Sequence, residues 1–280
     1  MKTLNILTKI DRRIIFLLIF FGVAVPLLVT INFKLGVTKN VRKVYNMVEE
    51  TQENSKVVIS YDYGPSTKPE IQPMAIALLN HAFRKKLRVI CVALWPMGVQ
   101  MCNEALETTL QHFPDLKYGK DYVNLGYKTG GQVTINHMAK NFRSTFPTDE
   151  GGTPIDELPI LNGINNFNKI AFIIGLSAGD PGIKQWVQVA HDSYGKPVAG
   201  GSTAVQVPFL LPYVNKQQQL TGLIGGLKGA AEYEKLINLP GFATKGMDAQ
   251  SIAHLIIILF IIIGNIGYFA SKKQKGKIKS

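Results

Sequence analysis

Two long apolar runs lie near the ends of the chain. Ile14–Phe33 carries no charged residue, and Ile252–Ala270 is interrupted only by the polar residues His254 and Asn265. At 1.5 Å per residue, each run forms a helix of about 30 Å, which matches the hydrocarbon core of a bilayer. We therefore predict transmembrane helices over residues 14–33 and 251–270, with the lipid bilayer as a partner.

Between these runs, short apolar segments alternate five times with longer amphipathic stretches, which is the pattern of a parallel sheet covered by helices. The predicted strands are Lys56–Tyr61, Arg88–Trp95, Asp121–Leu125, Lys169–Ile174 and Pro197–Gly200. The predicted helices cover residues 70–86, 98–113, 131–144, 181–193 and 216–237. The expected fold class of residues 56–250 is α/β, an open doubly wound, mostly parallel five-stranded sheet of the Rossmann-like kind.

Two segments depart from this alternation. Residues 34–55 are polar and basic, with Val37, Val41, Val44 and Met47 at helical spacing, so we expect a stalk between the first membrane helix and the domain. Phe146–Phe167 is rich in Gly, Pro and Asp. We expect this insertion to cap a cleft or to contact a partner.

The net charge of +12 is concentrated at the two ends of the chain. The basic tail 1–13 contributes +3 and the basic tail 271–280 contributes +5, whereas residues 34–250 hold 22 Lys or Arg against 18 Asp or Glu. The domain itself therefore lacks the strong positive charge that polyanion binding needs. We expect no nucleic-acid partner.

The basic residues also predict the orientation in the membrane. The two tails hold nine Lys or Arg, and the ends of the domain hold five, at Lys34, Lys39, Arg42, Lys43 and Lys245. Because positive flanks stay in the cytoplasm, we expect a two-pass cell-membrane protein with cytoplasmic termini and an extracytoplasmic domain. The four basic residues after the first run favour the opposite orientation. In that alternative, the domain is a cytoplasm-facing, nucleotide-responsive regulator.

The loops after the five predicted strands are polar and rich in glycine. In parallel sheets these loops line the ligand crevice, because helix N-termini and free amides converge there. They predict a site for a small polar or anionic ligand. Neither the dinucleotide pattern G-x-G-x-x-G nor the P-loop pattern is present, and we expect no cofactor. The candidate ligand-binding residues are Asp62, Ser66, Thr67, Gly130, Gly131, Ser177, Gly179, Asp180, Gly201, Ser202 and Thr203.

One of these loops contains a G-x-S-x-G motif centred on Ser177, between a predicted strand and a predicted helix. This is the sequence context of a hydrolase nucleophile. The histidine that should follow is not suitably placed, because His191 lies on the next predicted helix and His254 lies in the second membrane run. A membrane-bound serine hydrolase or transferase that uses Ser177, Asp180 and Asp62 is therefore the alternative function, and we assign no catalytic residue.

The segment Val205–Glu234 has an unusual pattern. Its apolar part, VPFLLPYV, is broken by two prolines, so we expect neither an interior strand nor an uninterrupted helix there. Four glycines follow with G-x-x-x-G spacing on a predicted helix, a pattern that permits close helix packing. The candidate interface residues are Gly222, Gly225, Gly226, Gly229, Phe209, Leu211 and Tyr213.

The remaining candidate chemistry is sparse. Cys91 and Cys102 are the two cysteines, and without a C-x-x-C motif we expect two buried thiols and no metal site. The function that fits these features is a non-enzymatic, membrane-anchored extracytoplasmic domain. It would act as a ligand-binding or assembly subunit, as a homo-oligomer or with partner subunits of a membrane complex.

Overall fold

The computed structural model describes residues 11–278 apart from 30, 32, 34–35 and 216–218. Most of the first predicted tail lies outside the described residues, as do the side chains of the second. The chain forms two compact units. Residues 35–243 form one unit, here called the body, and residues 1–34 with 244–280 form the other, here called the helix pair.

The body is built on one sheet of six parallel strands in the order β3-β2-β1-β4-β5-β6. The strand order reverses between β1 and β4, as in Rossmann-like doubly wound sheets, which confirms the predicted α/β class. The sheet has six strands, so the prediction of five was wrong. The strands are β1 (Lys56–Asp62), β2 (Arg88–Ala93), β3 (Tyr122–Tyr127), β4 (Ile170–Ser177), β5 (Val198–Ser202) and β6 (Leu223–Gly225).

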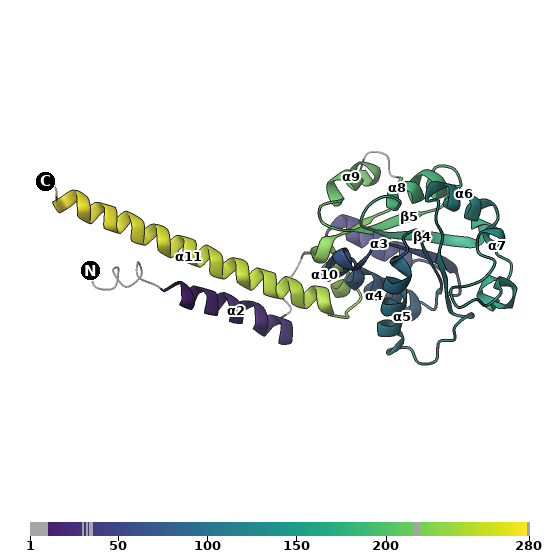
Figure 1. Cartoon of the computed structure of the whole chain (residues 1–280), viewed down its shortest axis with the longest axis horizontal. Helices are drawn as coiled ribbons and strands as arrows, with labels where there is room; N and C mark the ends of the chain where they lie inside the picture. Colours follow the sequence, from purple (N-terminus) through teal and green to yellow (C-terminus); the bar gives the residue numbers. More distant parts are fainter. Residues whose placement is uncertain (1–10, 30, 32, 34–35, 216–218, 279–280) are drawn as a thin grey trace. The chain divides into compact units, whose positions relative to one another are not determined.

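Helices cover both faces of the sheet (Figure 1). Helices α3, α4, α5 and α10 pack against one another, and α6, α7, α8 and α9 lie over the opposite face. The strands are almost wholly buried, which explains why they are continuously apolar in sequence. The helices are α3 (Lys39–Glu49), α4 (Lys68–Arg84), α5 (Gly98–Leu110), α6 (Gln132–Lys140), α7 (Phe142–Thr145), α8 (Ile183–Trp186), α9 (Val207–Asn215) and α10 (Gly226–Leu236).

The predicted stalk belongs to the body. Helix α3 packs on β6 and α10, and its residues Val41, Val44 and Val48 are buried. Thr38, just before α3, donates its backbone N–H and its hydroxyl to the buried carboxylate of Glu232 in α10, over 2.9 and 2.7 Å. The helical spacing of the valines was therefore correct, but their apolar stripe covers the sheet instead of linking two parts.

The insertion 146–167 is also part of the core. It contains the short 3-10 helices η2 (Ile155–Glu157) and η3 (Pro159–Leu161), and η4 (Phe167–Lys169) overlaps its end. Its apolar side chains, among them Phe146 and Ile160, are buried in the same cluster as α6 and α7. The Gly and Pro residues let the chain follow the domain surface, while the apolar residues between them fill the core.

The segment Val205–Glu234 folds differently from the prediction. VPFLLPYV lies in helix α9, with Pro212 inside the helix and Leu210 and Val214 buried. Pro208 is tolerated in the first turn, where its missing N–H would have no helical acceptor. Leu211 and Tyr213 are partly buried, whereas Phe209 is exposed.

The four glycines do not form a helix face. Gly222 and Gly225 lie before and within β6, Gly226 begins α10 with φ +58°, and Gly229 lies one turn later. Each is in close contact with atoms of its own chain, at α3, Val207, Ala204 and Ile224 respectively. The predicted helix over 216–237 therefore begins only at Gly226 among the described residues.

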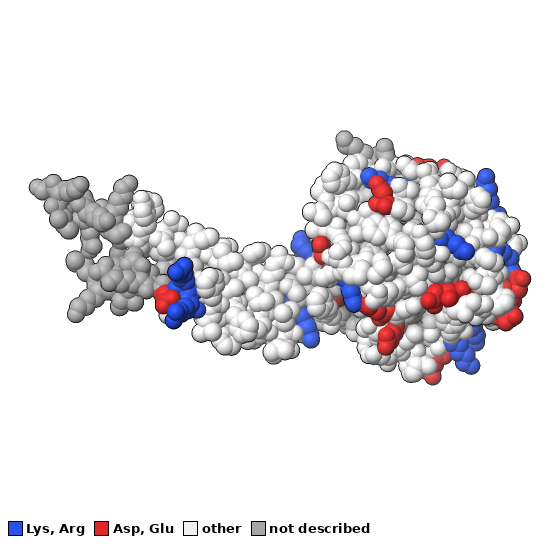
Figure 2. Space-filling view, viewed as in Figure 1, with Lys and Arg blue, Asp and Glu red and all other residues white. Residues whose placement is uncertain are grey.

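The helix pair consists of α2 (Arg12–Leu28) and α11 (Phe242–Ile278, of which Thr244 onwards lies in this unit). Over the described residues, α11 is the only helix that is long and apolar enough to cross a membrane, over Phe242–Phe269. Helix α2 has 17 residues and ends at Leu28, short of the predicted Phe33. Figure 2 shows the visible surface of the pair as uncharged over most of its length.

The two helices of the pair contact one another. The side chains of Ile252 and Ile256 lie against Gly22, where an added Cβ would displace the end of the Ile256 side chain. Beyond the end of α2, the buried carboxylate of Asp248 accepts hydrogen bonds from the backbone N–H groups of Ile31 and Phe33, each over 3.0 Å. The helix pair is therefore held by close packing and by a buried carboxylate.

Candidate functional site

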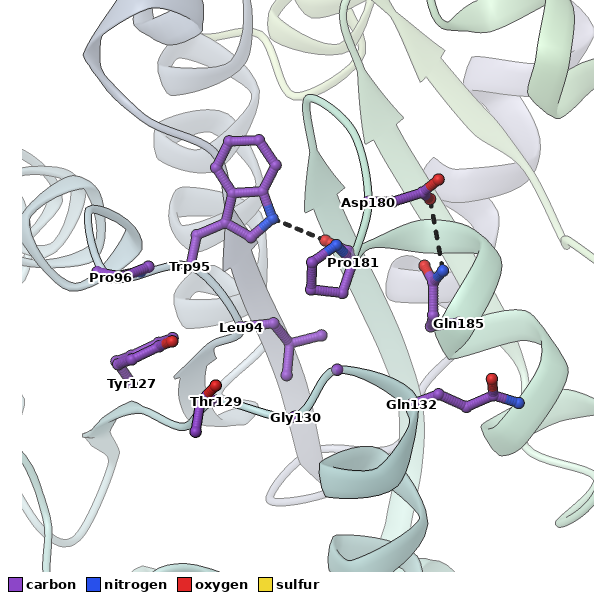
Figure 3. A pocket seen from close by; sticks show the side chains of 11 residues that line it. Leu94, Trp95, Pro96, Tyr127, Thr129, Gly130, Gln132, Asp180, Pro181 and Gln185 are labelled. Carbon is purple, nitrogen blue, oxygen red and sulfur yellow. Dashed lines mark hydrogen bonds between the residues drawn. The ribbon is translucent and has the colours of Figure 1, made fainter.

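A cavity of the body lies at the carboxyl end of the sheet, between the loops that follow β2, β3 and β4 (Figure 3). It is a cleft of about 620 Å³, within the range of small-molecule sites. The lining combines aromatic, amide, hydroxyl and carboxylate side chains with a glycine pair. The lining residues are Leu94, Trp95, Pro96, Tyr127, Thr129, Gly130, Gly131, Gln132, Asp180, Pro181 and Gln185.

Hydrogen bonds fix one wall of this cleft. The indole Nε1 of Trp95 donates to the carbonyl oxygen of Pro181 over 2.8 Å, which joins the β2 loop to the β4 loop. Gln185 in α8 accepts from the N–H of Gly182 over 2.8 Å and donates to Asp180 over 3.4 Å. Because its N–H is already bonded, Trp95 offers a ligand only its ring.

The opposite wall is the loop between β3 and α6. Gly130 and Gly131 have φ angles of +110° and +51°, a conformation that glycine adopts readily and other residues rarely do. The hydroxyl of Thr134 donates to the carbonyl of Thr129 and closes this turn. Tyr127 and Gln132 are exposed, and their polar side-chain atoms have no hydrogen-bond partner among the described residues. They are free to bond to a ligand.

The charge of the lining is carried by a single carboxylate, that of Asp180, and no Lys, Arg or His side chain lines the cleft. Lys128, which lies between the lining residues Tyr127 and Thr129 in sequence, has its ammonium 5.8 Å from the ring centroid of Phe146. An anionic ligand would therefore meet a like charge and no cation. The electrostatics favour an uncharged ligand over an anion.

Three of the predicted ligand residues, Gly130, Gly131 and Asp180, line the cleft. Asp62 is fully buried at the end of β1 instead. Its carboxyl accepts hydrogen bonds from the Ser60 hydroxyl (2.7 Å), the Leu94 N–H (2.8 Å) and the Trp186 indole (3.2 Å). Burial raises the pKa of Asp62 from 3.8 to about 7, although all three hydrogen bonds favour ionisation. Asp62 therefore joins β1, β2 and α8 inside the protein.

Ser177 is likewise structural. It is 2 % exposed, its hydroxyl donates to the carbonyl of Gly179 over 2.8 Å, and the backbone of Gly182 covers it. Its own carbonyl accepts a hydrogen bond from the Ser202 hydroxyl over 2.7 Å. Among the described residues, no histidine bonds to Ser177. The geometry of a nucleophilic serine is not formed here.

Of the other predicted positions, Gly179 adjoins the cleft, since a Cβ there would lie 3.5 Å from the Trp95 ring. Ser66 and Thr67 belong to the 3-10 helix η1 (Pro65–Thr67), Gly201 is packed against Leu176 and Met74 in the core, and Thr203 is buried. A second cavity beside Ser177, Gly179 and Ser202 has about 10 Å³, which is room for one water molecule at most.

The described residues contain no group of three or more His, Cys, Asp or Glu side chains arranged to hold a metal ion. Cys91 and Cys102 are both buried free thiols, and burial raises the pKa of Cys102 well above its ordinary value. His81 is buried between the Tyr233 hydroxyl and the Glu49 carboxylate, each at 2.8 Å, and joins α3, α4 and α10.

Sequence reasoning missed the aromatic and amide residues of the cleft, namely Trp95, Tyr127, Gln132 and Gln185. It selected glycine and short polar side chains because these are typical of turns. A usable signal was present: Trp95 and Tyr127 are aromatic residues at the carboxyl ends of two neighbouring strands, where buried packing no longer requires them.

No protein-family model matches the chain, and no curated protein matches it. Among solved structures, the chain is similar to a trehalose-6-phosphate synthase, with a TM-score of 0.29 and 10% identity. The alignment covers 89% of this chain and 49% of the synthase, so the chain spans about half of that protein's length. A likeness at this level says nothing about the activity of this chain.

Proposed function

We propose that this chain is a membrane-anchored binding protein whose body holds a small, uncharged and hydroxyl-rich ligand in the cleft between the β2, β3 and β4 loops. The observation that carries the proposal is the lining, in which two aromatic rings and four other polar side chains surround one space without a cation. No nucleophile or metal group accompanies them among the described residues, so binding is favoured over catalysis.

The chemistry of the lining supports this ligand class. The faces of Trp95 and Tyr127 can cover apolar C–H surface. The two glutamines both donate and accept hydrogen bonds, while Asp180 only accepts. A ligand with several hydroxyl groups satisfies this mixture, because each hydroxyl is both a donor and an acceptor. A small amine would use Asp180 and one ring and leave the amide of Gln132 without a role.

Ligand binding is tested with the full chain in detergent, following the intrinsic fluorescence of its two tryptophans, of which Trp95 lines the cleft and Trp186 is buried in the core. The probes are neutral mono- and disaccharides, inorganic phosphate and a primary alkylamine. We expect a saccharide to change the fluorescence, and we expect Gln132→Ala to weaken that binding at least about tenfold, the effect of one lost hydrogen bond of about 1.4 kcal/mol.

Gln188→Ala is the matched control, since Gln188 is an exposed glutamine outside the cleft. Binding of phosphate in preference to saccharides, or an equal effect of the two alanine variants, would contradict the proposed ligand class. The absence of any response to all three probes, with the chain folded, would contradict binding at this cleft.

We further propose that α2 and α11 both cross the membrane, with both termini in the cytoplasm and the body outside it. Several observations support a second span beside α11. Helix α2 is apolar and largely exposed after Arg13, it packs on α11 at Gly22, and Asp248 binds the chain beyond its end. Two membrane-spanning helices, one before and one after the body, leave both ends of the body on the same side of the membrane.

The orientation is tested by labelling intact cells with a membrane-impermeant thiol reagent. An exposed Glu157→Cys should be labelled and Ser280→Cys should not, while the buried Cys91 and Cys102 keep the unmodified chain as a blank. Labelling only at position 280 would reverse the orientation and favour a cytoplasmic body. The same membranes are washed with carbonate, and a chain that stays in them is still anchored. Retention therefore separates a reversed orientation from loss of anchoring.

A further inference from the structure

Two polar residues in the apolar part of α11, His254 and Asn265, lie on the side of the helix that faces away from α2. At 3.6 residues per turn, His254 and Asn265 are 11 residues apart and differ by about 20° around the axis. Ile252 and Ile256 contact α2, and their mean direction is about 170° from that of His254 and Asn265. The partner helix of the same chain therefore does not cover these polar groups.

These two polar residues belong to a continuous exposed row, here called the seam: His254, Ile258, Ile261 and Asn265. The spacing of 4, 3 and 4 residues is that of alternating d and a positions in a heptad, the geometry of a left-handed helix pair. Ile258 and Ile261 are 53% and 56% exposed, and His254 and Asn265 are also exposed. Within the helix pair, no described residue covers the seam.

We propose that the seam is the contact between two copies of this chain, formed inside the membrane by parallel α11 helices. The inference goes beyond ligand binding but rests on the proposed membrane span of α11. Polar side chains facing lipid are costly, and association of helices gives them hydrogen-bond partners.

A second copy fits the seam better than an unrelated partner. Two copies of one membrane protein share their orientation, so their α11 helices run parallel and a two-fold axis brings each seam residue opposite itself. Within its own helix the Asn265 amide donates one hydrogen to the Ile261 carbonyl over 3.0 Å. Its second N–H and its oxygen are a donor and an acceptor that the two copies can exchange in this arrangement. An Asn at a single a position is also the residue that fixes register in parallel helix pairs. The isoleucines between the polar residues supply the packing.

The glycines of the chain are not free to form the contact between two copies. Gly22 is occupied by Ile252 and Ile256 of the same chain. The four glycines of the body are likewise in contact with their own chain. The contact between copies that the sequence placed at the glycines of residues 222–229 is therefore proposed at the seam of α11 instead.

The test is disulfide trapping of the full chain in native membranes with four matched variants. Ile258→Cys and Ile261→Cys lie on the seam, while Ile257→Cys and Ile262→Cys are exposed isoleucines about 70° to either side of it. Oxidation should give a cross-linked dimer from the two seam variants and little from the two flanking ones. The unmodified chain is the blank, because Cys91 and Cys102 are buried.

Asn265→Leu, added to Ile258→Cys, should lower the dimer fraction about threefold, the effect of one interhelical hydrogen bond in a membrane. Ile262→Leu is the control and should leave it unchanged. Equal trapping at all four positions, trapping only at the flanking positions, or no trapping would overturn the seam contact. Carbonate extraction of the same membranes distinguishes the two proposals: a chain that is released lacks the span itself, whereas a retained chain without seam-specific dimers lacks only the contact.

Discussion

Asp62 illustrates the cost of a buried carboxyl group that has hydrogen bonds but no cation. Its three donors come from β1, the end of β2 and α8, so it holds the sheet together at the point where the strand order reverses. Desolvation nevertheless outweighs these bonds and raises its pKa to about 7. The position is thus specified by local geometry and is sensitive to pH.

We predict that Asp62 makes the folded state less stable as pH rises from 4 to 7. Its folded pKa lies above its unfolded value of 3.8, so in this window the folded state binds the extra proton and stability falls with increasing pH. The full effect is roughly 4 kcal/mol, on the order of the shift at 1.36 kcal/mol per unit. Asp62→Asn should remove this contribution.

The measurement is the free energy of unfolding of both proteins in detergent between pH 4 and 8. His81 contributes in the opposite direction, because burial lowers its pKa and stability then rises towards pH 6.5. The difference between the two proteins isolates Asp62, since His81 is present in both. A difference that does not change with pH would show that Asp62 is ionised throughout the range.

Ser177 gives the second prediction at this scale. A fluorophosphonate probe should not label the folded chain, because the Ser177 hydroxyl is buried and already donates to Gly179. A serine hydrolase in the same tube serves as the positive control. Labelling that disappears in Ser177→Ala would restore the hydrolase alternative.

At the scale of elements, the apolar pattern was sufficient wherever a strand is buried on both faces. β1, β2 and β4 are rich in β-branched apolar residues because a central parallel strand has no polar side. The sequence pattern did not predict β6, because Leu223–Gly225 has only three residues and lies at the sheet edge. The sequence pattern did not predict helix α9, because its two prolines oppose a helix locally. The helix forms because Leu210 and Val214, one turn apart, are both buried on the same side.

The cleft was predictable in position but not in composition. The edge of the sheet follows from parallel connectivity, and the glycines of the β3 loop were identified from their spacing in the sequence. Which side chains face the cleft depends on how three loops approach one another, as in the bond from Trp95 to Pro181, whose sequence separation is 86 residues. No local pattern encodes such a contact.

Gly222 allows a prediction about element packing. A Cβ at this position would lie 2.6 Å from the carbonyl oxygen of Asn40 and 2.8 Å from Val44 Cγ2, both in α3. Gly222→Ala should therefore destabilise the body by about 1–3 kcal/mol, the usual cost of overpacking. Gly36→Ala is the control, because no atom lies within 4 Å of a Cβ there. Denaturant unfolding of both variants measures the effect, and equal stabilities would refute the contact between α3 and β6.

At the scale of the whole molecule, the chain combines a body of mixed charge with an apolar helix pair and basic tails. The excess charge lies where a membrane protein needs it for orientation, and the cleft keeps only a carboxylate. The composition of the whole chain therefore says little about the ligand. A net charge of +12 would favour an anionic ligand only if it lay on the body, whereas the lining of the cleft favours an uncharged molecule.

The distribution of basic residues leads to the last prediction. The tails hold nine Lys or Arg against five at the ends of the body, and positive residues near a span resist translocation. Changing the five lysines of residues 271–280 to glutamine leaves four against five, so the balance reverses. We expect the variant to place part of its C-termini outside the cytoplasm, as measured by a C-terminal reporter that is active on one side only.

The control for this experiment changes the opposite side. Lys39, Arg42 and Lys43 are exposed on α3, so their replacement by glutamine should leave the fold intact and strengthen the native orientation. The two variants must therefore move the reporter in opposite directions if charge balance sets the orientation. Movement in the same direction, or no movement in either, would mean that folding of the body before insertion decides the orientation and that the count of basic residues does not.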